Sequence, residues 1–283
     1  MIVVTGASGK TGRAVIAALA ARGQSVRALI RRTETAAALR AAGAQETVTA
    51  SMADPDAFAR ALEGASAIYH ICPNVSSDEL LFGRNAAAAA RKAGVGRFVF
   101  HSVLHPQIEA MPHHWTKMRV EELLFETGLD VTILQPTAYM QNLLAGWRRI
   151  VDEGILRSPY PVETRISLVD LADVAEVAAR VLTEPGHAGA IYELVGTDPL
   201  SQTDVAASLS AALGRPVLAE AESIEVWEAR ARADGMDAGA CETLVKMFRY
   251  YARHGLVGNP TVLRGLLGRP PTTLAAFARR VVD

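Results

Sequence analysis

His113 and Lys117 lie four residues apart in the stretch HHWTK, and together they could handle a proton beside a negative charge. On a helix, positions i and i+4 share one face. An imidazole with its ordinary pKa of about 6.5 can donate a proton near neutral pH, and an ammonium group stabilises an anionic oxygen. Hydride addition to a carbonyl, quinone or enone leaves negative charge on oxygen, so the reaction uses a proton donor and a positive charge near that oxygen. The alternatives are a surface or loop role for His113 after Pro112 and a solvent-exposed helical position for Lys117.

Ser102 and Tyr139 are two further side chains that could donate a proton to a substrate oxygen. Ser102 follows the apolar run RFVFH, and Tyr139 follows VTILQPTA, so each lies just beyond an expected strand. Each also has a structural alternative. A serine at a strand end can be satisfied by backbone groups, and a tyrosine can pack under neighbouring elements.

The chain shows no motif for a metal ion or for a serine nucleophile. Its clustered histidines lack the helical i, i+4 pair with a carboxylate, so we expect no metal site. HSVLH lacks the glycines that flank a nucleophile elbow. Asp170 is expected to cap a helix, with Asp173 in its first turn, rather than to form an acid–base pair. The histidines in question are His101, His105, His113 and His114.

The stretch TGASGKTG joins an apolar N-terminal strand to an Ala-rich helix and carries Gly6, Gly9 and Gly12. Glycines in such a turn allow a sharp bend, close approach of backbone N–H groups to a pyrophosphate, and tight packing of the helix on the sheet. The helix N-terminus then faces the phosphates with unpaired N–H groups. A glycine-rich turn without a ligand is the alternative, but the position at the first strand–helix junction predicts dinucleotide binding.

The end of the second expected strand indicates which dinucleotide is bound. An acidic residue there would bind a ribose 2′-hydroxyl, whereas this chain has Arg31 and Arg32, and Lys10 lies within the turn. A guanidinium matches a phosphate in geometry and charge. The sequence therefore favours NADP(H) over NAD(H), unless the two arginines are only a solvated strand end.

These residues need a sheet to position them, and the first half of the chain alternates apolar runs with Ala-rich helical segments. Single helices between successive strands predict a parallel sheet covered on both faces. We expect an α/β fold of the Rossmann type, that is, a doubly wound parallel sheet. The expected strands are 1–6, 25–32, 44–50, 65–73, 97–104 and 130–136, and a helix at 116–128 precedes the last.

The second half of the chain is less regular and is expected to be mainly helical. We divide the chain into an NADP-binding Rossmann domain at 1–150 and a smaller substrate lobe at 151–283, with part of 165–200 returning to the Rossmann core. The elements expected here are helices at 139–154 and 168–186, a loop at 158–165, a strand at 190–196, and an irregular link at 258–273 before a last helix.

Composition narrows the class of protein. The chain has 283 residues, half of them hydrophobic, which is enough for a sizeable core. Its formal net charge of −1, with no basic run, indicates neither a nucleic-acid groove nor a membrane surface. Cys72 and Cys241 lack a C-x-x-C spacing, and no leader precedes the first strand, so we expect a cytoplasmic protein.

With these residues placed, the chain resembles the NmrA-like family of atypical short-chain dehydrogenases/reductases. That family includes quinone-reductase-like enzymes, isoflavone-reductase relatives and redox-sensing regulators. The resemblance covers nearly the whole chain. It rests on VTGASGKTGRAV, AGVGRFVFHSVLHP, KMRVEELLFETGLDVTILQPTAYMQNLL, ISLVDLADVAEVAARVL and LLGRPPTTLAAFA.

The resemblance implies roles for particular residues. Lys117 matches the family lysine that bonds the nicotinamide ribose. His113 stands where a tyrosine is usual, although a histidine also occurs there in some members, and Asp is usual where Ser51 stands. The implied pyrophosphate contacts are Gly6, Ser8, Gly9, Lys10, Thr11 and Gly12. Arg31 would meet the 2′-phosphate, Ser51 and Met52 the adenine, and Ile71, Cys72, Pro73 and Pro136 to Tyr139 the nicotinamide.

We therefore expect an NADP(H)-dependent oxidoreductase that transfers hydride to a quinone-like or unsaturated carbonyl compound, with His113 or Tyr139 as proton donor. Apolar and aromatic residues of the lobe favour an apolar or aromatic small molecule, and the sequence leaves a homodimer open. The alternative is a regulatory protein that senses NADP(H) without turnover, which the missing tyrosine favours. An epimerase or dehydratase on the same fold is a third alternative.

Overall fold

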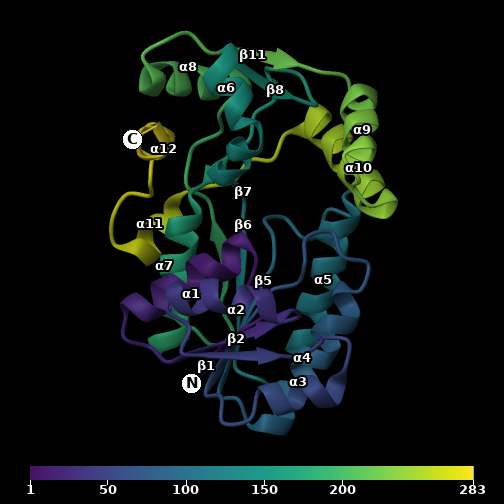
Figure 1. Cartoon of the computed structure of the whole chain (residues 1–283), viewed down its shortest axis with the longest axis vertical. Helices are drawn as coiled ribbons and strands as arrows, with labels where there is room; N and C mark the ends of the chain where they lie inside the picture. Colours follow the sequence, from purple (N-terminus) through teal and green to yellow (C-terminus); the bar gives the residue numbers. More distant parts are fainter. Residues whose placement is uncertain (283) are drawn as a thin grey trace. The chain divides into compact units, whose positions relative to one another are not determined.

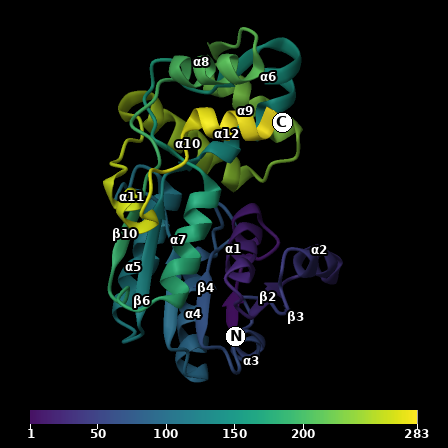
Figure 2. The same ribbon diagram turned by 90° about the vertical axis from the view of Figure 1, so that its left-hand side faces the viewer.

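A seven-stranded sheet forms the centre of the fold in the computed structural model, which describes residues 1–282. The strand order is β10-β6-β5-β4-β1-β2-β3, and Figure 2 shows it running from β10 to β3. Following this order from β6 to β3, each pair of neighbouring strands is parallel. The strands are β1 (Ile2–Val4), β2 (Val26–Ile30), β3 (Glu46–Thr49), β4 (Ala67–His70), β5 (Arg97–His101), β6 (Val131–Pro136) and β10 (Ile191–Leu194).

Helices cover both faces of this sheet, as the alternating sequence pattern requires. One face carries α1 (Lys10–Ala21) and α7 (Leu171–Thr183), and the other carries α3 (Pro55–Ala61), α4 (Glu79–Ala93) and α5 (Pro112–Phe125) (Figure 1). Strands β1 and β4 are buried along their whole length for the same reason. The prediction of a Rossmann-type, doubly wound parallel sheet is confirmed.

The chain order reverses at β1, whose neighbours are β4 and β2. In open α/β sheets, ligands bind at the carboxyl ends of the strands beside such a reversal. The segments that follow β1, β4 and β5 at this edge begin at Thr5, Ile71 and Ser102. The fold therefore places the glycine turn and several sequence-predicted site residues at one sheet edge.

The chain packs as two compact units. The first unit contains Met1–Gln107, His114–Gln135 and Val174–Tyr192, and the second contains Ile108–His113, Pro136–Asp173 and Glu193 onward. The first unit holds β1 to β5, nearly all of β6, and the helices between them. The second unit therefore starts as β6 ends and takes in one short earlier segment.

Two small sheets and several helices build the second unit. Strand β8 (Ile155–Ser158) pairs in parallel with β11 (Leu218–Ala221), and β7 (Ala138–Tyr139) pairs with β9 (Leu168–Val169). The helices are α8 (Gln202–Leu213), α9 (Ile224–Ala233), α10 (Ala238–His254), α11 (Thr261–Leu267) and α12 (Leu274–Val282). The β8–β11 pairing was not expected, because its two strands are short and lie 60 residues apart in the sequence.

Several boundaries differ from the sequence-based expectation. The helix expected at 139–154 is a 3₁₀ segment, η2 (Met140–Gly146), followed by α6 (Trp147–Glu153), because Gly146 interrupts the helical run. The link expected at 258–273 contains α11. The helix expected from Thr116 begins at Pro112, a residue favoured at a first helical position.

Asp170 and Asp173 organise the second unit. Asp170 caps α7 by accepting from the backbone N–H of Ala172 at 3.0 Å, as predicted. The sequence did not indicate that these two buried carboxylates also hold the C-terminal segment, through Arg280 and Arg269 at 2.6 and 2.8 Å. Among the described residues, no helix has the length and apolar character needed to cross a membrane.

Candidate active site

The turn after β1 has the geometry of a phosphate cradle. Gly6 adopts a positive φ of 55°, where a Cβ would lie 2.7 Å from the Ile71 side chain. At Gly12, a Cβ would lie 2.4 Å from the carbonyl oxygen of Gly6, so only glycine fits. The turn passes directly into α1, whose N-cap Gly9 has no side chain to satisfy the first backbone N–H groups.

Exposed cations lie beside this turn. Ser8, Gly9 and Lys10 are exposed, and the Arg13 guanidinium donates to the carbonyl oxygen of Ser8 at 3.1 Å and so braces the turn. Arg31 follows β2 directly and is exposed. The combination of a glycine turn, a helix N-terminus and an exposed guanidinium fits a dinucleotide that carries a further phosphate.

The residues expected beside the adenine differ in accessibility. Ser51 is exposed, and its hydroxyl accepts from the backbone N–H of Ala53 at 3.2 Å. Met52 is 5% exposed and packs in the hydrophobic core, while its carbonyl oxygen accepts from Asn85 at 2.8 Å. Of the two, Ser51 is the one open to a ligand.

Thr5 ties the ends of β1 and β4 together. Its hydroxyl donates to the carbonyl oxygen of Ile71 at 3.0 Å and accepts from the Ile71 N–H at 2.8 Å. His70 Nδ1 is hydrogen-bonded to the same hydroxyl at 3.2 Å. This link fixes the start of the segment Ile71 to Pro73 against the glycine turn.

Cys72 is not a nucleophile in this fold. It is buried, and burial, followed by the nearby Glu79 carboxylate, raises the pKa of its thiol to about 12. The thiolate is the reactive form of cysteine, and it is negligible at neutral pH with such a pKa. Cys72 can therefore contribute only packing and weak hydrogen bonds, which it makes to His70 Nε2 and to the carbonyl oxygen of Glu79.

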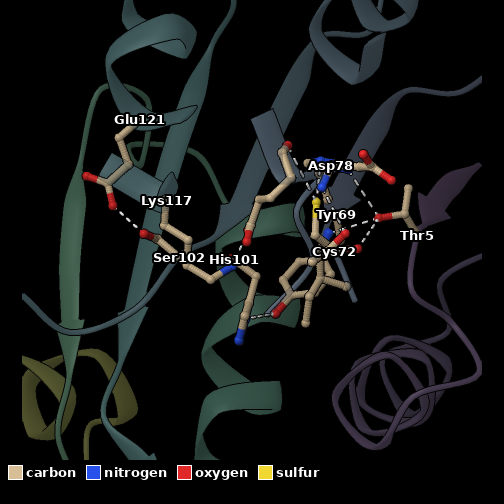
Figure 3. A network of polar contacts seen from close by, with 12 residues as sticks. Thr5, Tyr69, Cys72, Asp78, His101, Ser102, Lys117 and Glu121 are labelled. Atoms are coloured by element: carbon tan, nitrogen blue, oxygen red, sulfur yellow. Dashed lines mark hydrogen bonds and ion pairs between the residues drawn. The ribbon is translucent and has the colours of Figure 1, made fainter. Parts of the chain in front are cut away.

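Two buried histidines lie close to Lys117 and are neutral. Burial, and secondarily the positive charge of Lys117, lowers the pKa of both His70 and His101 to about 3. His101 Nδ1 is hydrogen-bonded to the Tyr69 hydroxyl (Figure 3). His101 is therefore a buried core residue at the end of β5 rather than a surface group.

Lys117 enters this region from the second turn of α5. Its ammonium forms an ion pair with Glu79, lies 3.4 Å from the carbonyl oxygen of His101, and stands 5.6 Å from the centroid of the Phe100 ring. The Lys117 side chain is only 13% exposed. The structure thus places it at the carboxyl end of β5 rather than on an exposed helix face.

Ser102 is buried, and its hydroxyl bonds to a side chain. The structural alternative for this residue was a hydrogen bond to backbone groups. The Ser102 hydroxyl donates to the carboxylate of Glu121 (Figure 3). The same carboxylate also accepts from the side-chain amide of Gln135 at 3.0 Å. Burial raises the pKa of Glu121, and the hydrogen bonds from Ser102 and Gln135 oppose that rise. The hydroxyl proton of Ser102 is therefore engaged in a hydrogen bond to Glu121 within the first unit.

His113, Pro136 and Tyr139 belong to the second unit. His113 is half-buried in the first turn of α5, one helical turn before Lys117, so the helical spacing expected for the pair is present. Tyr139 is half-buried in β7, beside Val169 of β9, and Pro136 ends β6. His114, by contrast, is buried against the carbonyl oxygen of His105 at 3.2 Å, and burial lowers its pKa to about 4.

Comparison with known proteins assigns this chain to a family. The sequence profile of the NmrA-like family matches residues 1–274. The chain belongs to the NmrA-like family. The family predicted from the sequence motifs is therefore confirmed.

Three relatives show how far the similarity extends. The NmrA-like chain is 31% identical to an NAD(P)H azoreductase of Xenophilus azovorans over 281 residues, covering 99% of this chain and 97% of the relative. It is 30% identical to quinone oxidoreductase 2 of Escherichia coli (strain K12), covering 97% and 96%. A crystal structure of the NADPH-dependent quinone oxidoreductase QOR2 from Escherichia coli, complexed with NADPH, matches with a TM-score of 0.87 and 28% identity, over 100% of both chains.

Three buried polar residues of this NmrA-like chain were not anticipated. Glu79 pairs with Lys117, while Glu121 and Gln135 engage Ser102. One local signal was available for Glu79, since it lies in the first turn of α4, where acidic residues are favoured. Glu121 lies four residues after Lys117 on α5, a spacing that suggests an ion pair within the helix, whereas the structure pairs Lys117 with α4 instead.

Proposed function

We propose that this NmrA-like chain is an NADP(H)-dependent oxidoreductase that transfers hydride to a quinone-like or unsaturated carbonyl compound. The observation that carries the reaction class is the similarity, over nearly the whole chain, to an NAD(P)H azoreductase and a quinone oxidoreductase. The glycine turn before α1 supports the same proposal, because a Cβ at Gly12 would collide with the backbone of Gly6 and Ala7 and deform the turn.

The chain's own residues would hold the cofactor at the carboxyl edge of the sheet. Backbone N–H groups from Ser8 to Gly12 would bind the pyrophosphate, and Arg31 would bind the 2′-phosphate. Ser51 would lie by the adenine and Ile71 to Pro73 along the nicotinamide. When bound, NADPH supplies the hydride. The protein supplies orientation and charge, with Lys117 as the ribose contact.

The product oxygen would receive its proton from His113 or Tyr139. Neither Cys72, with its raised pKa, nor Ser102, whose proton is donated to Glu121, fits that role as well. Hydride addition makes the acceptor oxygen negative, and a donor at that oxygen completes the reduction. His113 shares α5 with Lys117, which supports it as the first candidate.

An apolar or aromatic substrate is part of the proposal. The relatives named above are an azoreductase and a quinone oxidoreductase, and several aromatic side chains of the second unit pack against one another. Trp227, Phe248, Tyr160 and Tyr251 of that unit form a chain of ring contacts with centroid separations of 4.7 to 6.1 Å. These packed rings are the feature of the second unit that supports an aromatic substrate in this proposal.

We also infer that the protein acts in the cytoplasm. Cys72 and Cys241 are both free thiols, and both are buried. Unpaired cysteines are usual where glutathione and thioredoxin keep thiols reduced. Fractionation of the native host, with immunodetection of the protein, tests this inference, and recovery outside the cytoplasmic fraction would contradict it.

The test of function is NADPH oxidation measured against a panel of quinones, enones and simple carbonyls. Wild type should oxidise NADPH with at least one quinone or enone, and Lys117→Ala and His113→Phe should both slow that turnover. Tight NADPH binding with no oxidation above buffer for any acceptor would replace this proposal with the NADP(H)-sensing regulator. Absence of NADPH binding would overturn both.

A further inference from the structure

The ammonium of Lys117 is held from two sides by parts of the first unit. Glu79, the first residue of α4, provides a carboxylate that is 1% exposed, and the carbonyl oxygen of His101 lies 3.4 Å away. Figure 3 shows Lys117 beside His101, close to the end of β5. The position of the ammonium is thus set by groups distant in sequence as well as by its own helix.

Glu79 supplies the negative charge that this buried cation requires. Among the other titratable groups that interact with the ammonium, His70, His101 and His114 are neutral at physiological pH because burial lowers their pKa values to about 3, 3 and 4, and burial raises the pKa of the Cys72 thiol to about 12. The Glu121 carboxylate also interacts with the ammonium, but its hydrogen bonds go to Ser102 and Gln135, whereas Glu79 is paired directly with Lys117. A largely desolvated ammonium without a counter-charge is strongly destabilising, because it has lost most of its hydration. Glu79 is the first residue of α4, and its carboxylate is the ion-pair partner of Lys117.

Holding Lys117 in this way matters for ligand binding. A lysine side chain loses much of its rotamer entropy when it is fixed in one conformation. In this fold the loss occurs on folding, through the ion pair, so a ligand that meets the ammonium does not have to order it. The ion pair thus prepares the lysine for a ligand at the carboxyl end of β5.

We propose that Glu79 is a positioning residue for Lys117, fixing its ammonium at the carboxyl end of β5 for contact with the bound cofactor. The inference rests on the proposed function, because it takes NADPH as the ligand of Lys117. The competing explanation is that the ion pair only fastens α4 to α5. That explanation predicts an effect of Glu79 on stability and no dependence of cofactor affinity on the pair.

A double-mutant cycle on NADPH affinity separates the two explanations. The dissociation constant of NADPH is measured by nicotinamide fluorescence for wild type, Glu79→Gln, Lys117→Met and the double variant, with folding checked by circular dichroism. Glu79→Gln should weaken binding about tenfold, as expected when a charged group loses a hydrogen-bonded partner. In the Lys117→Met background the same change should have no effect, because Glu79 acts only through the lysine.

Two further variants make the cycle specific. Asp78→Asn removes a negative charge one residue away, at an exposed position, and should leave the affinity for NADPH unchanged. Glu79→Asp keeps the charge on a shorter side chain and should recover part of the loss. If Glu79→Gln does not fold, Glu79→Asp takes its place in the cycle. It should then weaken binding with Lys117 present and not with Met at that position.

The outcomes that overturn the inference are distinct from failure of the proposed function. Equal losses with and without Lys117, or tighter NADPH binding by Glu79→Gln, would show that Glu79 does not position the lysine for the cofactor. Wild type without measurable NADPH affinity would overturn the proposed function and this inference together.

Discussion

The hydroxyl of Ser102 donates to the carboxylate of Glu121, which joins the end of β5 to the middle of α5 inside the first unit. Both residues are 2% exposed, and Gln135 of β6 donates to the same carboxylate. A buried carboxylate with three hydrogen bonds stabilises the junction of three elements. The bond also determines what Ser102 can do in catalysis.

Ser102→Ala should therefore affect stability more than chemistry. Loss of the hydrogen bond leaves part of the Glu121 carboxylate unsatisfied, so the free energy of unfolding should fall by about 1–3 kcal/mol, measured in urea. Turnover of NADPH should fall less than tenfold, whereas loss of an essential proton donor costs about a hundredfold or more. Ser208→Ala, in α8, serves as the control and should change stability by less than about 0.5 kcal/mol. A hundredfold loss of turnover with normal stability would instead identify Ser102 as a donor to substrate.

Gly12→Ala should destroy the phosphate cradle. The added Cβ would stand 2.4 Å from the carbonyl oxygen of Gly6 and 2.7 Å from the Cα of Ala7, so the backbone of the turn must move. We expect NADPH affinity to fall by at least about a hundredfold, since several N–H contacts depend on that turn. The matched control is Gly265→Ala in α11, where nothing lies within 4 Å of the new Cβ. Unchanged NADPH affinity in Gly12→Ala would contradict the placement of the pyrophosphate.

Arg31→Asp should change which cofactor is preferred. The carboxylate would repel a 2′-phosphate and could accept from a ribose 2′-hydroxyl, so NADPH affinity should fall about a hundredfold while NADH affinity falls little or rises. Titration of each nucleotide by fluorescence measures both constants. Arg253→Asp, a charge reversal at an exposed position in α10, should alter neither. Equal losses for the two nucleotides would remove the assignment of Arg31 to the phosphate.

Stability should decrease as the pH falls below about 6.5, the ordinary pKa of histidine. His70 and His101 have folded-state pKa values of about 3, so the unfolded chain binds more protons than the folded chain between these values. The stabilisation is complete above the unfolded pKa and is lost progressively as the pH approaches about 3. Urea unfolding at a series of pH values measures the slope, and His70→Gln and His101→Gln should each reduce it. Most carboxylates titrate below about pH 5, so a loss of stability between pH 7 and pH 5 reports mainly on the histidines. A stability that does not change between pH 7 and pH 4 would be inconsistent with neutral buried histidines.

Features carried by one local segment could be predicted from the sequence. The glycine turn needs only Gly6, Gly9 and Gly12 between a strand and a helix, and the structure has that turn with a positive φ at Gly6. The alternation of apolar strands and Ala-rich helices likewise predicts a parallel sheet. The geometry of each βαβ unit depends mainly on its own consecutive elements. The helix cap at Asp170 could also be predicted from the sequence, since its hydrogen bond reaches only two residues along the chain.

The partners of the site residues were decided only by the tertiary structure. Glu79 meets Lys117 across 38 residues of sequence, and Gln135 meets Glu121 across 14, each from a different element. Hydrophobic periodicity specifies which face of an element is buried, but it does not specify which buried polar groups will face each other. The sequence by itself therefore determined the parallel sheet and the glycine turn, and it predicted Lys117 as a site residue. The buried charges around them follow from how α4, α5 and β6 pack, because burial and pairing are properties of the assembled core.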